Sequence, residues 1–286
     1  MIYFLDKNHK YFNDKGQELT SVSGIMKKYL PEFDEDSLTS LIKAFRIYCE
    51  EVYQYARKKY KWWEQENILN YMISQEPEIY RLKIESLAAS FRNKWDSLGE
   101  EASEYGTEKH AEEEKAAEEK GFLINPVDGM KYKVIPRASG DGYDNSYILD
   151  EVLKMKENVC MLEGMVADEE KLICGQEDRI YLKYMGAGFF HAMNHDFKTD
   201  KILKNKSMWI GRDLERMKGE LNYFNTANLH VYTMKMSLYG VLLENTGKVK
   251  VVKNFLEHIP KDKEKKYINL SYYKEYATRV INNFTV

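Results

Sequence analysis

The triplet Asp196-Phe197-Lys198 places a carboxylate and an ammonium group two residues apart. Side chains i and i+2 of a β-strand project to the same face, so a strand here would present Asp196 and Lys198 together and turn Phe197 into the core. A carboxylate can hold a hard cation such as Mg²⁺, and a lysine beside it can orient or activate a water molecule. An ordinary ion pair at a strand end has the same pattern, so the surroundings decide its meaning.

Two further carboxylates precede this triplet on strand-like segments. Strict alternation places Asp178 on the same face as the apolar Ile180, and places Ile173 on the opposite face. An acid on a core-side face needs a hydrogen-bond partner or a metal ion. Glu163 could supply another carboxylate from the preceding strand. The alternatives are a hydrogen-bonded structural acid for Asp178 and an exposed hairpin acid for Glu163.

Two pairs of residues with helical spacing could add to such a site. His110 and Glu114 would share one helix face, where an imidazole and a carboxylate can join a metal shell or orient a phosphate. Lys235 and Tyr239 have the same spacing, and the tyrosine could reach a phosphate or order the site. Surface pairs on helices share this spacing, so neither pair is diagnostic by itself.

In chain order, these residues resemble the motifs of the PD-(D/E)xK nuclease superfamily, specifically its RecB-like and phage exonuclease branch. That branch has a helix with G-T-x-x-H, a strand that begins with Glu, G-x-x-D, D/E-x-K, and a helix with Q-x-x-x-Y. The corresponding residues here are Gly106-Thr107 with His110, Glu163, Gly175 with Asp178, Asp196 with Lys198, and Lys235 with Tyr239. Lys235 departs from the pattern, because it stands where the branch has glutamine.

The resemblance implies a Mg²⁺- or Mn²⁺-dependent deoxyribonuclease, an exonuclease of phage-type DNA recombination or processing rather than a sequence-specific endonuclease. It implies that Asp178, Asp196 and His110 ligate the metal. Lys198 would position or help deprotonate the attacking water. Two further acids would act in the outer shell or on a second ion, namely Glu114 and Glu163.

DNA is the partner that the resemblance implies. Three residues are expected at the substrate phosphate: Tyr239, Lys235 and Lys201. Further phosphate contacts are expected from the basic residues that follow the triplet: Lys204, Lys206, Arg212 and Lys218. A single-strand annealing or recombination protein would be a second partner, and an oligomer is compatible with the sequence. Two alternatives stay open, a catalytically silent member that binds DNA or protein, and a structural protein in which the motif order is coincidence.

The elements that must position these residues can be located from the sequence. We expect three strands in the middle of the chain, at 161–167, 171–184 and 189–197, and another at 248–258. Long helices are expected at 208–245 and 271–284, whereas 121–142 has the composition of a loop. This order indicates an α/β (α+β) fold in which helices flank a central mixed sheet, a restriction-endonuclease-like core with an added N-terminal helical subdomain. The expected parts are 1–34 as a hairpin and helix, 35–95 as the helical subdomain, and 96–286 as the nuclease core.

Composition restricts the remaining possibilities. The 286 residues include 43 Lys and Arg against 46 Asp and Glu, a net charge of −3, so no strongly basic footprint marks the whole chain. No segment reaches the roughly 18 consecutive apolar residues of a membrane span. The absence of a secretory signal, together with three cysteines, favours the cytoplasm of a bacterium or a phage-infected host. Three cysteines are too few for the iron–sulfur cluster of some superfamily members, so no cluster is expected.

Overall fold

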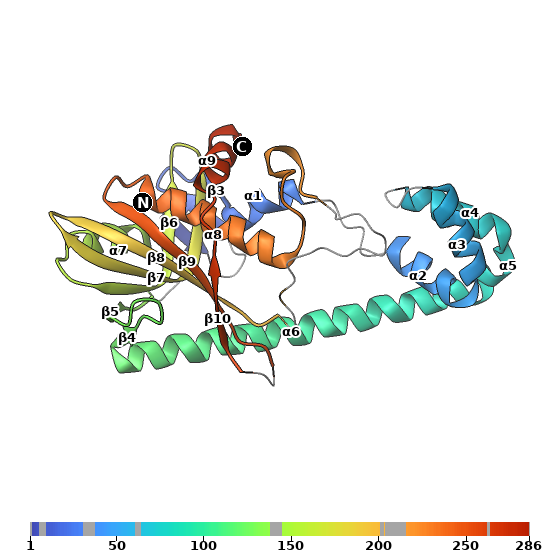
Figure 1. Cartoon of the computed structure of the whole chain (residues 1–286), viewed down its shortest axis with the longest axis horizontal. Helices are drawn as coiled ribbons and strands as arrows, with labels where there is room; N and C mark the ends of the chain where they lie inside the picture. Colours follow the sequence, from blue (N-terminus) through green and yellow to red (C-terminus); the bar gives the residue numbers. More distant parts are fainter. Residues whose placement is uncertain are drawn as a thin grey trace. The chain divides into compact units, whose positions relative to one another are not determined.

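The computed structural model describes residues 2–5, 10–30, 38–60, 64–137, 145–200, 203, 216–261 and 264–285. The chain divides into two compact units (Figure 1), the larger formed by Met1–Pro31 with Gly106–Val286 and the smaller by Glu32–Tyr105. The second boundary falls inside helix α6 (Glu85–Lys120). The division from the sequence had placed boundaries at 34/35 and 95/96.

The strands of the larger unit form one mixed sheet of ten strands in the part of the chain that the structure describes. They are β1 (Ile2–Leu5), β2 (Lys10–Asn13), β3 (Glu18–Ser21), β4 (Phe122–Ile124), β5 (Lys131–Ile135), β6 (Val159–Asp168), β7 (Ile173–Gly186), β8 (Phe189–Lys198), β9 (Val249–His258) and β10 (Lys266–Leu270). The order β1-β2-β3-β7-β6-β5-β4 crosses the sheet, and β8 pairs with both β7 and β9. The predicted fold class, a mixed sheet flanked by helices, is confirmed.

The sheet is forked at β7. One edge of β7 pairs with antiparallel β6 from Ile173 to Leu182, with a gap at Asp178. The other edge pairs with antiparallel β8 from Arg179 to Gly186, and with parallel β3 at Ile173 and Cys174. Residues 175–178 lie between these two ladders, so this edge of their backbone is open to side chains and ligands. The motif G-x-x-D occupies the fork.

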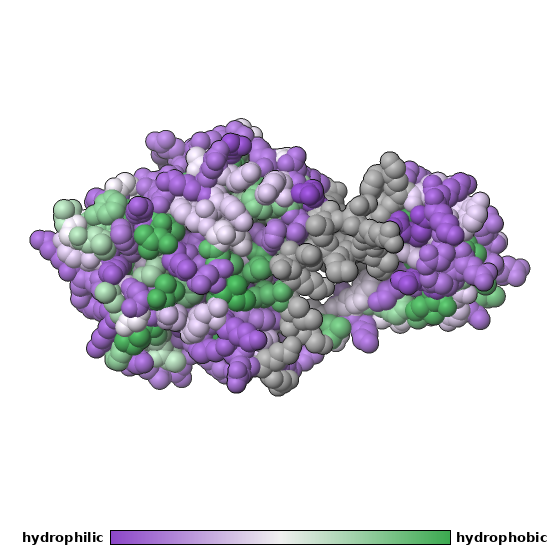
Figure 2. Space-filling model, viewed as in Figure 1, coloured by the Kyte–Doolittle hydropathy of each residue, from purple (hydrophilic) through white to green (hydrophobic). Residues whose placement is uncertain are grey.

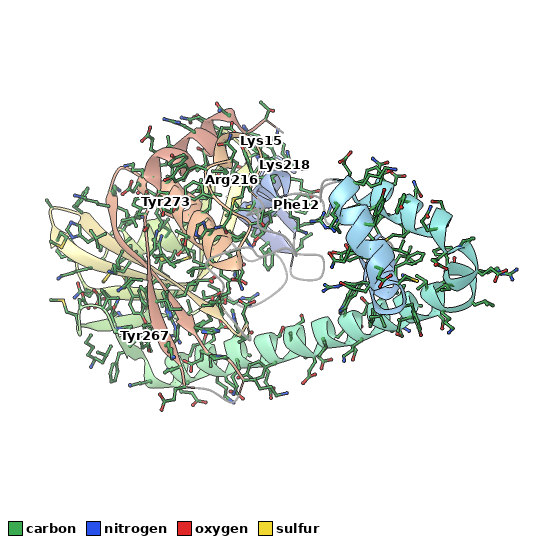
Figure 3. All side chains as sticks on the ribbon, turned by 45° about the vertical axis from the view of Figure 1, so that its right-hand side comes forward. Phe12, Lys15, Arg216, Lys218, Tyr267 and Tyr273 are labelled. Atoms are coloured by element: carbon green, nitrogen blue, oxygen red, sulfur yellow. The ribbon has the colours of Figure 1, made fainter. Side chains whose placement is uncertain are left out.

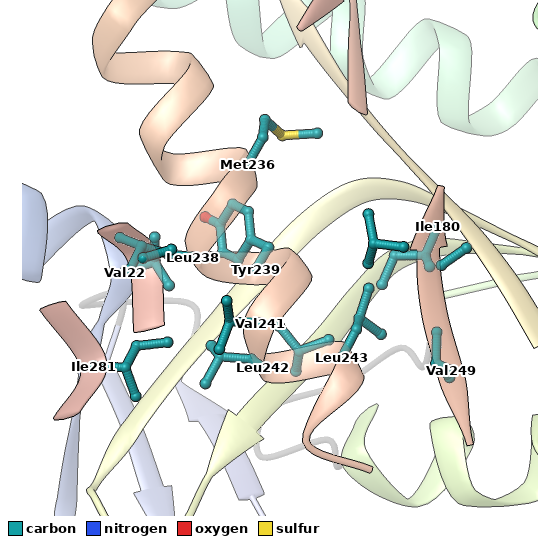
Figure 4. Close-up of a cluster of buried hydrophobic side chains, with 14 of the residues drawn as sticks. Val22, Ile180, Met236, Leu238, Tyr239, Val241, Leu242, Leu243, Val249 and Ile281 are labelled. Atoms are coloured by element: carbon teal, nitrogen blue, oxygen red, sulfur yellow. The ribbon is translucent and has the colours of Figure 1, made fainter. Parts of the chain in front are cut away.

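Helices and apolar side chains enclose the sheet on both faces (Figure 1). One core contains side chains of β6, β7 and β8 with those of α1 (Val22–Tyr29), α7 (Asn145–Val152), α8 (Asn228–Glu244) and α9 (Lys274–Asn283). Figure 4 shows its centre, where Tyr239, Leu242 and Leu243 of α8 lie among residues of the other elements. A second core lies on the other face, where Ala117 of α6 packs with Tyr181 and Phe255.

The smaller unit is helical and has its own core. Its elements are α2 (Leu38–Tyr48), α3 (Glu50–Lys59), α4 (Gln65–Gln75), α5 (Pro77–Ile79), the π-helical turn η2 (Tyr80–Ile84) and the first part of α6. Phe45, Ile68, Met72 and Ile84 are completely or almost completely buried together. Burial of this apolar stripe at three-to-four spacing is what makes the segment helical.

Several predicted elements are confirmed, and two are wrong. The strands β6 to β9 and the helix α9 agree with the expected segments to within a few residues. The expected loop 121–142 instead contains β4 and β5, because these short segments pair with each other and with the buried strand β6. The helix expected over 208–245 is wrong for 216–227, where a bridge joins Arg216 to Asn225 and the 3₁₀ turn η3 (Gly219–Leu221) lies between them, so α8 begins at Asn228. Residues 208–215 lie outside the described residues.

The exposed surface is of mixed polarity. Figure 2 shows hydrophobic residues in groups among hydrophilic ones on the face in view, which is normal because apolar atoms contribute more than half of most protein surfaces. Among the described residues, no helix combines the length and apolar character that a membrane crossing requires.

Candidate metal centre

Three potential metal ligands meet beside the fork, each from a different element. His110 lies on α6, Glu163 on β6 and Asp178 on β7. One ligand atom of each lies within 4.8 Å of the others, and all three side chains are half-buried. Two carboxylates and an imidazole are a donor set that suits Mg²⁺ or Mn²⁺.

Asp178 is held by contacts across the fork. The backbone N–H of Phe197 donates to its Oδ2 atom at 2.5 Å. In the fork, where β7 and β8 no longer pair, this bond takes the place of a backbone hydrogen bond between the two strands. Its Oδ1 atom lies 3.6 Å from Nδ1 of His110. The ring of Phe197 meets the His110 ring edge-on at 5.5 Å between centroids, which limits the rotation of the imidazole. The geometry of the fork therefore fixes both side chains.

Glu163 adopts a backbone conformation that is rare for its residue type. Its φ is +47°, in the left-handed region, although it lies inside β6. It stands across from Asp178, between the ladder pairs Leu162–Arg179 and Gly164–Glu177. Such strain persists where the surroundings impose it, and it concentrates at functional sites.

The sheet changes faces at this point, contrary to the sequence prediction. Met161 and Val166 share one core although they are an odd number of residues apart, and so do Ile173 and Ile180. Strict alternation had placed Ile173 and Ile180 on opposite faces, which is wrong. Both strands therefore break their alternation once, where Glu163 and Asp178 face each other, and the break turns these acids toward a common point.

The carboxylates of the site lie close together and repel one another. Burial, followed by repulsion from Asp178 and Glu114, raises the pKa of Glu163 to about 8. Burial and the charge of Asp196 raise the pKa of Asp178 to about 6. Burial also raises the pKa of Glu114, which lies on α6 one turn after His110. A cation would favour the ionised form of each group, so the electrostatics and the ligand geometry agree.

Asp196 and Lys198 lie next to this triad and contact each other. Their carboxylate and ammonium groups form an ion pair. Lys198 also donates to the carbonyl oxygen of Phe197 at 2.7 Å and lies 4.9 Å from the ring centre of Tyr232. Burial opposes its charge, but Asp196 and Asp178 outweigh burial and raise the pKa of Lys198. The strand prediction for this triplet is confirmed, whereas the ligand role of Asp196 stays a prediction, because its carboxylate is paired with lysine.

The helical pair Lys235 and Tyr239 lies on α8, on the side of the sheet occupied by the first core. Tyr239 packs tightly on the fork, since a Cβ atom on Gly175 would lie only 2.2 Å from its ring. Lys235 is half-buried, and burial followed by the charge of Lys198 lowers its pKa. Lys201, the third residue expected at the phosphate, lies outside the described residues.

A cavity of about 500 Å³ adjoins the triad at Glu163. Its walls come from the N-terminal strands, the start of α1, the fork and α8, and they consist of Phe4, Tyr11, Ser21, Ser23, Arg137, Glu163, Gly175, Gln176 and Tyr239. Ser21 caps α1, because its hydroxyl accepts from the N–H of Gly24 at 3.0 Å. The sequence analysis missed Arg137, whose charge acts on both Glu114 and Glu163. It falls in the segment interpreted as a loop, and no local pattern marks it.

A second set of buried charges lies behind the triad, on the α6 face of the same strands. Arg179 donates to the carbonyl oxygen of Glu113 at 3.1 Å, and its guanidinium lies 4.0 Å from Glu257. Glu257 also lies 3.2 Å from Nε2 of His195 and 2.6 Å from Lys265. Although burial opposes ionisation, His195 and Lys265 hold the pKa of Glu257 at about 2. These contacts tie α6, one turn beyond His110, to the strands that carry Asp178 and Asp196.

Comparisons with known proteins leave the identity of the chain open. No protein-family model matches it, and no curated protein matches its sequence. Among solved structures, the crystal structure of a putative exonuclease from Eubacterium rectale aligns with 93% of this chain and 78% of that chain, at 13% sequence identity and a TM-score of 0.27. A TM-score at this level carries no argument, so the functional case depends on the residues of the site.

Proposed function

We propose that this protein is a metal-dependent nuclease that hydrolyses phosphodiester bonds of DNA, as an exonuclease of phage-type recombination or processing. The observation that supports it is the meeting of His110, Glu163 and Asp178 at the fork, directly beside the Asp196–Lys198 pair. Its core would be the larger unit, which contains all five residues.

The three residues of the triad would hold Mg²⁺ or Mn²⁺. When bound, such an ion polarises a phosphate and lowers the pKa of a coordinated water. Lys198, half-buried and cationic, would orient the attacking water and stabilise negative charge that develops on the phosphate. Asp196 would hold that ammonium group in place or exchange it for the ion. Glu114, one helical turn from His110, would orient the shell from outside.

The cavity beside Glu163 would receive substrate. Arg137 and the hydroxyls of Ser21 and Ser23 at the start of α1 are donors suited to a phosphate group. Tyr239 lines the same cavity, whereas Lys235 lies nearer Lys198. Lys201 would add a phosphate contact from beyond the triplet. A recombination or single-strand annealing protein would act on the product and is the partner class that this role requires.

One observation favours a second candidate, a catalytically silent DNA-binding protein. Lys235 stands at the position where the nuclease branch has glutamine, and an added cation close to Lys198 would weaken the hold on a metal ion. A silent protein would show salt-sensitive DNA binding without cleavage in any divalent cation.

The deciding experiment is degradation of end-labelled linear duplex, with closed circular DNA beside it, in Mg²⁺, in Mn²⁺ and in EDTA. The wild type is compared with Lys198→Ala and with Lys133→Ala, which removes an exposed lysine of β5 that pairs with Glu157. We expect metal-dependent loss of linear DNA that disappears in Lys198→Ala and persists in Lys133→Ala. Cleavage of the circle would identify an endonuclease instead. No cleavage of either substrate by the wild type would overturn the proposal.

A further inference from the structure

A group of exposed cations surrounds the end of α1 in the larger unit. Lys27 and Lys28 lie in its last turn, and Lys218 is held there because its backbone N–H donates to the carbonyl oxygen of Tyr29 at 2.7 Å. Arg216 lies two residues earlier, and Figure 3 shows it close to Lys218. Within the described residues, no acidic side chain forms an ion pair with any of these four. They are cations that attract an anion rather than members of internal pairs.

The most exposed large apolar side chain of the described residues is next to these cations. Tyr223 is 71% exposed, and its carbonyl oxygen accepts from Nη1 of Arg216 at 2.9 Å. One face of its ring stacks on Tyr276 at 6.3 Å between centroids and 19° between planes. Arg279 lies 5.8 Å from the centre of the Tyr276 ring and supports that stack from behind. The ring of Tyr223 is therefore held in place and presents an aromatic surface to solvent.

Glu220 is the one acidic side chain that the structure describes within the segment 216–223, and its carboxylate accepts from Nδ2 of Asn283 at 2.8 Å. Lys28 lies 4.3 Å from the centre of the Phe284 ring, so its charge is placed over an aromatic face. Among the residues that the structure describes in α1 and in 216–223, four cations stand against this one carboxylate, so their summed charge is positive.

This surface is continuous with the candidate metal centre through α1 and α8. Val22 of α1 and Tyr239 of α8 both pack on Gly175 at the fork. Lys27 lies close enough to Lys235 for its charge to act on that residue, and Lys198 acts on Lys235 from the other side. Lys235 thus lies between Lys198, which is paired with Asp196, and Lys27 in the last turn of α1.

We propose that Lys27, Lys28, Arg216, Lys218 and Tyr223 form a binding surface for a single strand of DNA that leads to or from the metal centre. We call these five residues the strand surface; its role as part of a nuclease rests on the proposed function. Phosphates would lie along the cations, and an unpaired base would stack on Tyr223. A single strand is the occupant because cations beside an exposed aromatic ring bind backbone and base together, whereas the bases of a duplex are stacked internally.

The test is the affinity of the full chain for a fluorescein-labelled oligothymidylate of roughly 20 nucleotides, longer than one binding site of this class. Binding is followed by anisotropy in EDTA. Tyr223→Ala should raise Kd at least about fivefold, and Tyr223→Phe should bind like the wild type. The double variant Lys28→Gln/Lys218→Gln should reduce the slope of log K against log salt by about 0.7 for each lysine removed. Tyr267→Ala, the matched control, removes a tyrosine that is 47% exposed on β10.

Three results would overturn the strand surface. They are unchanged affinity in both surface variants, an equal loss in Tyr267→Ala, and a duplex that binds tighter than the single strand and is equally weakened by Tyr223→Ala. Hydrolysis of bis(4-nitrophenyl) phosphate with Mn²⁺ separates the two proposals, because that small phosphodiester does not reach the strand surface. Hydrolysis by all variants alike, with weakened strand binding, supports both. Absence of hydrolysis in the wild type, with the same binding pattern, removes the nuclease and leaves the strand surface.

Discussion

The central strands of the sheet carry buried charged groups in two places, the α6 face and the fork, and the two groups differ in how their charges are arranged. On the α6 face, Glu257 lies within reach of His195, Arg179 and Lys265, and its pKa is held at about 2. At the fork, Glu163 and Asp178 lie close together, and their pKa values are raised to about 8 and about 6. In the first set the nearby cations outweigh burial, whereas at the fork burial and repulsion between the carboxylates outweigh the attraction of Lys198 and Arg137.

This difference separates a structural set of charges from a functional one. Buried charges that serve the fold are paired, because an unpaired buried charge is costly. Carboxylates that repel one another lower stability unless something outside the chain binds them. The contrast is therefore evidence for a cation at the fork, and it can be tested one residue at a time.

The largest effect is expected from Asp178→Asn. The amide keeps the shape of the side chain and its bond from Phe197, but it removes the negative ligand. Loss of an outer-shell partner costs 10- to 100-fold at metal sites, so loss of a direct ligand should reduce DNA cleavage by more than about 100-fold. The rate of linear duplex degradation in Mn²⁺ is the measurement. Cleavage within tenfold of the wild type would remove Asp178 from the site.

In contrast to Asp178→Asn, Glu257→Gln should lower the free energy of unfolding. It leaves Arg179 and Lys265 without their shared carboxylate, and breaking a buried pair costs about 3–5 kcal/mol. Unfolding in urea at pH 8 measures the free energy of unfolding. Asp178→Asn, measured beside it, should be as stable as the wild type or more so, because it removes a repelling charge. Equal destabilisation by both variants would erase the distinction between the two faces.

Stability without metal should fall as the pH rises. An unfolded glutamate loses its proton near pH 4.5, whereas folded Glu163 keeps it to about pH 8, so the folded state binds more protons between these values and loses stability as pH increases. Thermal unfolding in EDTA should show this fall, at about 2–4 °C for each kcal/mol lost. The stabilising shift on adding Mn²⁺ should grow with pH, because ionised carboxylates bind the ion. Glu163→Gln should flatten both trends; an unaltered pH profile would contradict the assignment.

The smallest effect is expected from Lys235→Gln, which restores the glutamine of the resembled motif. Loss of one phosphate contact should raise KM a few-fold, leave kcat nearly unchanged, and reduce the salt slope for duplex binding by about 0.9. Steady-state cleavage of linear DNA at several salt concentrations provides all three values. A large gain in kcat would instead show that Lys235 weakens the metal centre.

Much of the architecture could be predicted from the sequence because local pattern determines it. Alternating apolar residues specified β6 to β9. The residue types of the site could also be recognised in the sequence, since carboxylates, an imidazole and a lysine are the groups that metal-dependent phosphodiester hydrolysis needs. No sequence pattern identified Arg137 as a residue of the site.

Only the tertiary structure decided which of these groups meet. The fork at Gly175–Asp178 depends on β3 pairing with β7 across more than half the chain, and no local pattern encodes that contact. The left-handed backbone at Glu163 breaks the alternation that sequence reasoning assumed and turns this acid toward Asp178. The ion pair between Asp196 and Lys198 also comes from the structure, while the ligand role of Asp196 stays a prediction. Residues close together in the sequence determine the individual helices and strands. The site, in contrast, depends on which strands lie side by side, and pairing between segments far apart in the sequence decides that.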